Sequence, residues 1–193
     1  MLHSDKKAFG FKERGDRITV LLCVSKNGDF INPLFVGKYK NPRVFKGTNL
    51  KELNINYVSS KRAWMNKAIF NNWLCEINHY FKLKNKKIVL FLDNCSAHCD
   101  KNLSNIKLVF YPPNTSSIIQ PLDLGIIKNF KDHFRNFYMN KVVLDSINLK
   151  QYQINLLDAI IWAKLSVWKI KKLTVQKCFE RSEKNILDLK SKG

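Results

Sequence analysis

Asp93 and Asp123 are the two residues whose positions most clearly suggest chemistry. Asp93 directly follows a short apolar run, Ile88 to Leu92, and Asp123 lies further along the chain in the segment SIIQPLDLG. Open α/β sheets bind ligands beyond the carboxyl ends of their strands, which is where Asp93 would stand. Carboxylates are the ligands that hard divalent cations prefer. We therefore interpret the two aspartates as parts of a metal-ion site for phosphodiester chemistry.

The elements that position these two acids are predicted from the spacing of apolar residues. The run Ile88 to Leu92, opened by lysines and closed by an Asp-Asn pair, is typical of a strand that is buried on both faces. Asp123 follows Pro121 and comes four residues before Ile127 on the apolar stripe of a predicted helix. Its side chain should therefore point toward the sheet.

The remaining pattern predicts alternating strands and helices. Strands are expected at Arg17 to Ser25, Phe30 to Val36, Asn56 to Ser59 and Ile106 to Tyr111, and helices at Asn66 to Phe81, after Pro121 to Tyr138, at Ile154 to Ile170 and at Thr174 to Leu189. The opening residues 1–16 are basic and show no periodic pattern, so we expect an entry loop or the stump of a longer segment there. Trp64 and Trp73 lie in or beside the apolar stripe of the helix at 66–81, which favours packing roles over base stacking.

Composition limits the class of protein. The chain has 193 residues, of which 45% are hydrophobic and 12% aromatic, so it can bury the core of one domain and is not expected to be disordered. Five widely spread cysteines, with no signal peptide or long apolar span, favour a reducing intracellular compartment and no membrane association. Cys95, His98 and Cys99 resemble half a zinc site, but the sequence offers no second pair of ligands at matching spacing.

The formal net charge of +19 indicates a polyanionic partner, most often nucleic acid. A protein from a lysine-rich proteome would show a similar excess without such a partner. Two groups of basic residues are candidates for phosphate contacts: Lys38, Lys40 and Arg43, which alternate with aromatic residues, and Lys128, Lys131 and Arg135, which share one helix face. A solvated surface explains either group equally well.

Five segments, taken in order, resemble the DDE-type transposases of the pogo/Tigger group, which is related to centromere protein B. They are TVLLCVSKNG from Thr19, PLFVGKYKNPRVFKG from Pro33, AWMNKAIFNNWL from Ala63, IVLFLDNCSAH from Ile88 and VFYPPNTSSIIQPLDLGIIKNFK from Val109. The later segment DAIIWAKLSVWKIKKLTVQKCFERS resembles the helical tail of the same domain. The resemblance spans nearly the whole chain, and five motifs in order are far more specific than any one of them.

This resemblance implies an α/β fold of the ribonuclease H-like type, a mixed sheet flanked by helices. Residues 1–145 would form the endonuclease domain and residues 146–193 its C-terminal helical extension. In this family three acids hold two divalent ions, Mg²⁺ or Mn²⁺, and Asp93 and Asp123 match the second and third acids. Asn94 and His98 fall inside the motif, where they either position water or DNA or form a turn and a strand-end cap. DNA would be the partner and the nucleus the compartment, with assembly as a homo-oligomer left open.

The chain departs from the family pattern at its start. The family's first acid lies on the first strand in a motif that resembles Asp-Glu-Thr-Gly, which this chain lacks, and Asp5 and Asp16 stand where the family has no catalytic acid. The helix-turn-helix modules that normally precede the domain are also absent. We therefore expect a domain without its first strand and first acid, inactive in strand cleavage and transfer. The alternative is a non-catalytic, transposon-derived remnant that binds DNA or protein.

Overall fold

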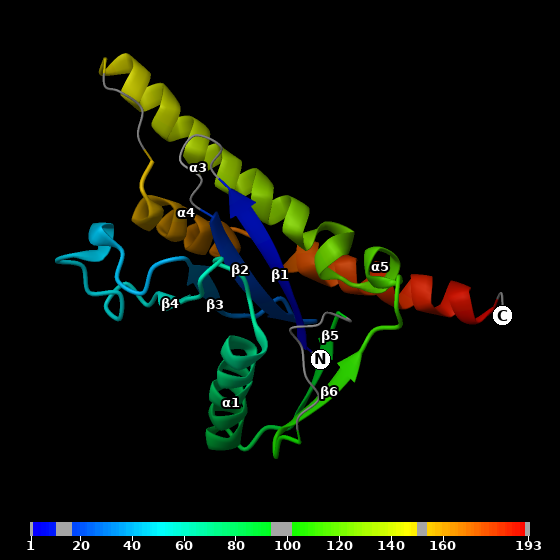
Figure 1. Cartoon of the computed structure of the whole chain (residues 1–193). Coiled ribbons are helices and arrows are strands. Elements are labelled where there is room, and N and C mark those ends of the chain that lie inside the picture. Colours follow the sequence, from blue (N-terminus) through cyan, green and yellow to red (C-terminus); the bar gives the residue numbers. More distant parts are fainter. Residues whose placement is uncertain (1, 11–16, 94–101, 150–153, 192–193) are drawn as a thin grey trace.

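A computed structural model describes residues 2–10, 17–93, 102–149 and 154–191, with residues 2–10 and 190 described by their backbone. Six strands form one mixed sheet in the order β4-β3-β2-β1-β5-β6 (Figure 1). They are β1 (Leu2–Gly10), β2 (Arg17–Ser25), β3 (Phe30–Gly37), β4 (Asn56–Ser59), β5 (Ile88–Leu92) and β6 (Ile106–Phe110). The expected mixed sheet flanked by helices is confirmed.

The directions of the strands place most of their carboxyl ends at one edge of the sheet. β2 is antiparallel to both β1 and β3, whereas β1 with β5, β3 with β4, and β5 with β6 are parallel pairs. The carboxyl ends of β1, β3, β4, β5 and β6 therefore point the same way. A ligand that binds this carboxyl edge meets the loops that follow these five strands.

The expectation of an entry loop in place of a first strand is wrong. Residues Leu2–Gly10 form β1, which pairs with β2 along its whole length and with β5 from Leu2 to Ser4. The physical reason lies in β2, whose residues are buried from Ile18 to Val24, so that it must be an interior strand with a partner on each side. Residues Leu2–Gly10 can be this partner because strands pair through main-chain hydrogen bonds, which do not require alternating apolar side chains.

Two hydrophobic clusters lie on opposite faces of the sheet. On one face α1 (Lys67–Leu83) packs Phe70, Trp73, Leu74 and Ile77 against Leu21 and Cys23 of β2 and Leu90 and Leu92 of β5. We call this the α1 face. The helix begins where the sequence predicts, because the Asn66 side chain accepts a hydrogen bond from the Ile69 backbone N–H at 2.9 Å.

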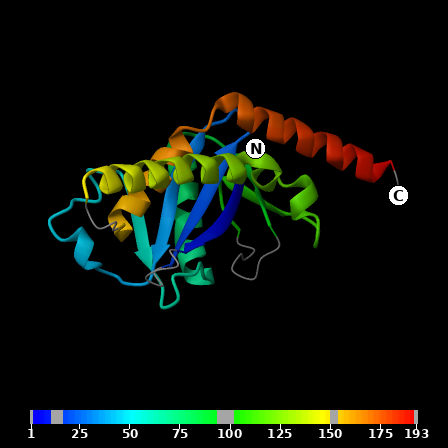
Figure 2. The same ribbon diagram turned by 90° about the horizontal axis from the view of Figure 1, so that it is seen from above.

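The other face is covered by the later part of the chain, η2 (Leu122–Ile126), α3 (Ile127–Ile147), α4 (Leu156–Trp168) and α5 (Lys172–Lys190). We call it the α3–α5 face. Figure 2 shows these helices along one side of the sheet, with α1 on the other. Their apolar residues form one cluster with Ile18, Val20, Leu22 and Val24 of β2. No helix in the described part of the chain is long and apolar enough to span a membrane.

Candidate metal and nucleic-acid site

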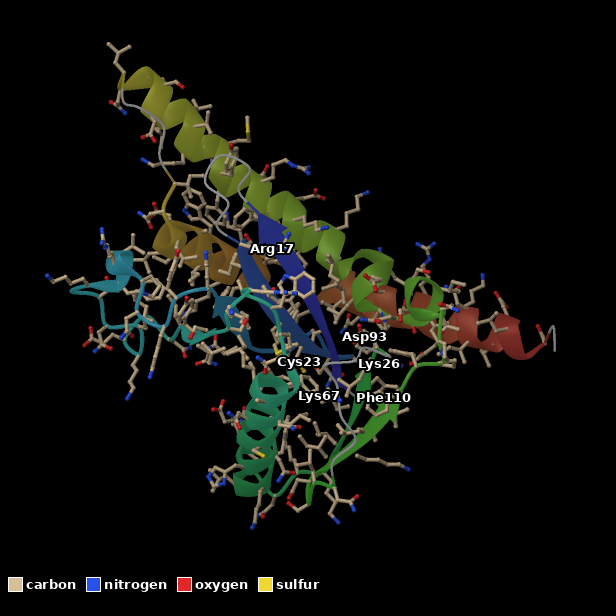
Figure 3. All side chains as sticks on the ribbon, in the orientation of Figure 1. Arg17, Cys23, Lys26, Lys67, Asp93 and Phe110 are labelled. Atoms are coloured by element: carbon tan, nitrogen blue, oxygen red, sulfur yellow. The ribbon has the colours of Figure 1, made fainter. Side chains whose placement is uncertain are left out.

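Asp93 directly follows β5 at the carboxyl edge of the sheet, as predicted (Figure 3). The end of β5 is held by β6, since the Tyr111 backbone N–H donates to the Leu92 carbonyl at 2.9 Å. The rings of Phe91 and Tyr111 also lie 5.8 Å apart. Asp93 is partly buried, and its Oδ1 atom is shielded from solvent. The carboxylate is therefore held on a fixed strand end rather than on a solvated loop.

Side-chain alternation indicates which face Asp93 belongs to. Leu90 and Leu92 lie in the cluster on the α1 face. Successive strand residues point to opposite faces, so Phe91 belongs to the α3–α5 face, and Asp93 follows if the alternation continues by one residue. This is the face on which Asp123 is found.

Asp123 lies in η2, a single π-helical turn between α2 (Ser116–Ile119) and α3. Its neighbours Leu122 and Ile126 are fully buried in the cluster on the α3–α5 face, and Asp123 itself is partly buried. A regular helix from Pro121 was expected. Instead, Gly125 has a φ of 158°, and a Cβ at that position would lie 3.0 Å from the Cys178 sulfur of α5. The close approach of α5 thus accounts for glycine at this turn.

The turn that carries Asp123 is anchored by α5. The Ser182 hydroxyl donates to the Ile119 carbonyl, and the Asn185 side-chain amide donates to the Ile118 carbonyl at 2.6 Å. These bonds fix α2, which leads into Gln120, whose carbonyl accepts from the Asp123 backbone N–H at 3.0 Å. The position of Asp123 therefore depends on the last helix of the chain.

Gln120 is a candidate site residue that sequence reasoning missed. Its side chain is 1% exposed, and within the described part of the structure neither amide atom has a hydrogen-bond partner. Buried amides are almost always hydrogen-bonded, so this side chain is suited to a ligand. The available signal was a single polar residue between the apolar pairs Ile118-Ile119 and Pro121-Leu122.

Both candidate acids come from elements that touch β1. β5 pairs with β1, and η2 packs against it from the α3–α5 face. Asn94 and His98, like Cys95 and Cys99, lie outside the described residues. Among the residues that are described, no three His, Cys, Asp or Glu side chains are grouped as a metal site.

β1 also brings the backbone of Asp5 to the same level of the sheet. Ser4 is in register with Leu92, so the next residue along β1 is level with Asp93. Asp5 is in register with Leu22, a residue of the α3–α5 face. This position of Asp5 was not predicted from the sequence, because the strand that carries Asp5 was not expected.

The predicted basic residues are all exposed but form two separate groups. Lys38, Lys40 and Arg43 follow β3 at the carboxyl edge, and Lys128, Lys131 and Arg135 lie on α3. Within the second group Arg135 is 3.6 Å from Asp132, which offsets part of its charge. The first group contains no such acid, since residues 37–51 include neither Asp nor Glu.

The two buried cysteines of the described chain are expected to have unreactive thiols. Burial raises the pKa of the Cys23 thiol far above its ordinary value. Burial also raises the pKa of Cys178, although a hydrogen bond with the Ile126 backbone and the nearby Arg181 act in the opposite direction. Neither thiol is suited to act as a nucleophile.

Comparisons with known proteins show what this chain is similar to. The family model described as DDE superfamily endonuclease matches residues 15–179. The chain is 33% identical to the mouse Tigger transposable element-derived protein 4 over 169 residues, which cover 86% of this chain and 33% of that protein. It is 34% identical to the human Jerky protein homolog over 140 residues, 66% of this chain and 25% of that protein.

A fission yeast relative, the CENP-B homolog protein 2 of Schizosaccharomyces pombe, is 28% identical over 183 residues, 86% of this chain and 35% of that protein. The chain thus spans about a quarter to a third of the length of these relatives. No solved structure was found to match it.

Proposed function

The chain belongs to the DDE superfamily endonucleases, and from this membership we propose that it is a transposase-derived domain that binds DNA and one divalent cation but does not cut DNA by itself. The observation that carries the proposal is that β5, which Asp93 follows, and η2, which carries Asp123, both contact β1. The whole proteins that resemble it are much longer, so their complete activities are not attributed to this chain.

The residues present fit a magnesium or manganese ion by their chemistry. Asp93 and Asp123 supply carboxylate oxygens, and Gln120 supplies a buried amide that has no protein partner in the described structure. Oxygen donors of this kind suit hard divalent cations. When bound, such an ion would lower the pKa of an attacking water and stabilise the leaving oxygen of a phosphodiester.

The proposed absence of cleavage rests on the acid count. The chain has no Asp-Glu-Thr-Gly motif, and two carboxylates hold one cation where the two-ion reaction needs a second anchoring charge. Asp5 is the acid of β1 that could stand in for the missing one, since its backbone is level with Asp93. A nicking assay can decide this point.

DNA as the partner is supported by the net charge of +19 and by exposed lysines and arginines at the carboxyl edge and on α3. The similarity to a CENP-B homolog, a protein named after a centromere protein, points the same way. A DNA partner in turn supports a nuclear location. The same charge favours the second candidate, a non-catalytic remnant whose DNA binding needs no cation.

Titration with Mn²⁺, followed by the loss of the free-ion electron paramagnetic resonance signal, tests the metal site. We expect the wild-type chain to bind the ion, and Asp93→Asn and Asp123→Asn each to weaken binding by about ten-fold or more. The matched control is Asp132→Asn on α3, which removes an acid already paired with Arg135. Equal affinity in all four proteins would overturn the metal site and leave the remnant as the better function.

Incubation with supercoiled plasmid and either Mg²⁺ or Mn²⁺ tests the proposed inactivity. We expect no nicking by the wild-type chain above the level of an Asp93→Asn control. Nicking that disappears in both Asp93→Asn and Asp5→Asn would contradict the proposal and identify Asp5 as the acid that completes the site.

A further inference from the structure

Trp64 does not have the packing role that its sequence context predicts. It is 52% exposed, whereas Trp73, in the second turn of α1, is only 4% exposed. Trp64 lies in the loop between β4 and α1, at the carboxyl edge of the sheet. Exposing so large an apolar side chain forgoes its burial energy, so its position calls for a role outside the core.

The loop that presents Trp64 is held rigidly. Ala63 has a φ of 54°, a left-handed conformation that is unfavourable for a residue with a side chain. It is kept there because the buried Thr19 hydroxyl donates to the Ala63 carbonyl at 2.8 Å. The Ser60 hydroxyl donates to the Trp64 carbonyl at 2.6 Å, and Ala63 and Met65 are buried on either side. The flanking residues thus point inward and the indole outward.

The surroundings of Trp64 are basic and contain a second exposed aromatic residue. The Arg17 guanidinium lies 5.8 Å from the centre of the Trp64 ring, and Lys61 and Arg62 beside it are exposed. Tyr39 is 55% exposed, with the Lys38 ammonium 5.3 Å from its ring centre.

The loops that carry these two aromatic residues are joined, since the Ser60 backbone N–H donates to the Gly37 carbonyl at 2.9 Å. Neither residues 37–51 nor residues 60–67 contain an acid. Exposed aromatic rings among cations, without opposing carboxylates, are the combination that binds single-stranded nucleic acid.

We propose that Trp64 is a stacking platform for an unpaired base of single-stranded DNA, with Arg17, Lys61 and Arg62 neutralising the adjacent phosphates. This inference rests on the proposed DNA binding and adds the class of substrate. In an intact duplex every base is already stacked inside the helix, so an indole on a surface loop finds a base only in unpaired or frayed DNA.

The platform is separate from the acid site but lies within reach of the same DNA. Arg17 is in register with Gly10, and Asp93 is level with Asp5, the residue after Ser4, so the two positions are five residues apart along β1, or about 17 Å at 3.3 Å per residue. This corresponds to roughly five base steps of 3.4 Å. In Figure 3 the two residues lie at different levels of the sheet, with Arg17 nearer the head of the β1 arrow than Asp93.

The test compares the binding of a fluorescently labelled oligo(dT) single strand with that of a duplex of equal length, at one fixed salt concentration. We expect Trp64→Ala to weaken oligo(dT) binding by about ten-fold, since one stacked base is lost. Trp64→Phe should retain most of the affinity, and duplex binding should change less than about two-fold because stacking contributes nothing there. The matched control is Trp168→Ala, which removes an equally exposed indole (50%) from the end of α4.

Tryptophan fluorescence gives a second readout. Oligo(dT) should quench the emission of the wild-type chain and of Trp168→Phe, whereas Trp64→Phe should lose most of this quenching. The inference is overturned if Trp64→Ala binds oligo(dT) as tightly as the wild type does, if the loss is equal for single strand and duplex, or if the chain binds duplex alone. Failure to bind either DNA would instead refute the proposed function itself.

Discussion

The two faces of the sheet are built from different stretches of the chain. The cluster on the α1 face joins residues between Leu21 and Leu108, which come mainly from the strands and from α1. The cluster on the α3–α5 face joins β2, at Ile18, to Phe179 of the last helix. One face is therefore completed early in the chain, whereas the other closes only when α5 has packed.

This difference matters because the two acids are positioned by elements that are anchored on different faces. Asp93 extends from β5, whose Leu90 and Leu92 are anchored on the α1 face. Asp123 is carried by η2, which α5 holds through Cys178 at Gly125 and through the bond from Ser182 to Ile119. A site that needs both β5 and η2 in place is complete only when both faces are packed, so we infer that residues 146–193 belong to the same folding unit as the sheet.

Phe179→Ala should have the largest effect and tests this inference directly. Phe179 is fully buried on the α3–α5 face, and removing such a ring costs about 3–5 kcal/mol of unfolding free energy. Phe70→Ala, its counterpart on the α1 face, should cost a similar amount. Urea denaturation should show one shared transition in both variants.

The matched control for Phe179→Ala is Leu187→Ala, an exposed position on the same helix that should change stability by less than about 0.5 kcal/mol. A separate early transition in Phe179→Ala, with the rest of the protein unaffected, would mean that the two faces fold independently.

The α1 face is also the part that the sequence predicts best. Apolar periodicity located β2, β5 and α1 with their bounds correct to within about two residues, because their side chains are buried in regular patterns. Asp93 at the end of β5 follows from the same pattern. The local sequence is sufficient to predict an element whose own apolar residues bury it in the core.

The predictions failed where the cause lies elsewhere in the chain. β1 has no apolar pattern and is a strand because β2 and β5 offer it main-chain partners. Trp64 is exposed because Thr19, forty-four positions away along the chain, holds Ala63 in a left-handed conformation. The π-helical turn at Asp123 reflects the approach of Cys178 from α5. None of these long-range causes is visible in a local window.

Gly28→Ala probes the contact between the β2–β3 turn and α5 with a smaller expected effect. Gly28 has a φ of 84°, and an added Cβ would lie 2.9 Å from the Lys172 backbone. Gly47 has a similar φ of 79° but open space around it, so Gly47→Ala measures the conformational strain alone. We expect about 1–3 kcal/mol from Gly28→Ala and less from Gly47→Ala, measured by urea denaturation. Equal losses of stability in the two variants would show that the β2–β3 turn is not in close contact with α5.

The pH dependence of stability tests whether the Cys23 thiol on the α1 face is buried away from solvent. Burial raises the pKa of Cys23 above its ordinary 9.0, so the folded protein keeps this proton after the unfolded chain has lost it. Stability from this group is complete below pH 9 and falls as the pH rises further, by about 1.4 kcal/mol per unit. Between pH 8 and pH 10 the wild type should therefore lose about 1.4 kcal/mol more than Cys23→Val. Identical losses would place a solvated thiol at Cys23.

The smallest effects should come from the ion pairs that join the β2–β3 turn to α5. Lys26 lies 2.6 Å from Glu183, and Lys172 lies 2.7 Å from Asp29, but all four side chains are about half exposed or more. Exposed pairs lose most of their attraction to solvent and to side-chain entropy, so Lys26→Met and Lys172→Met should each cost less than about 1 kcal/mol. The loss should shrink further in high salt, because screening already weakens the pairs in the wild type. If either variant lost as much stability as Phe179→Ala, charge rather than apolar packing would hold α5 on the sheet, and the contrast between the two faces would need a different explanation.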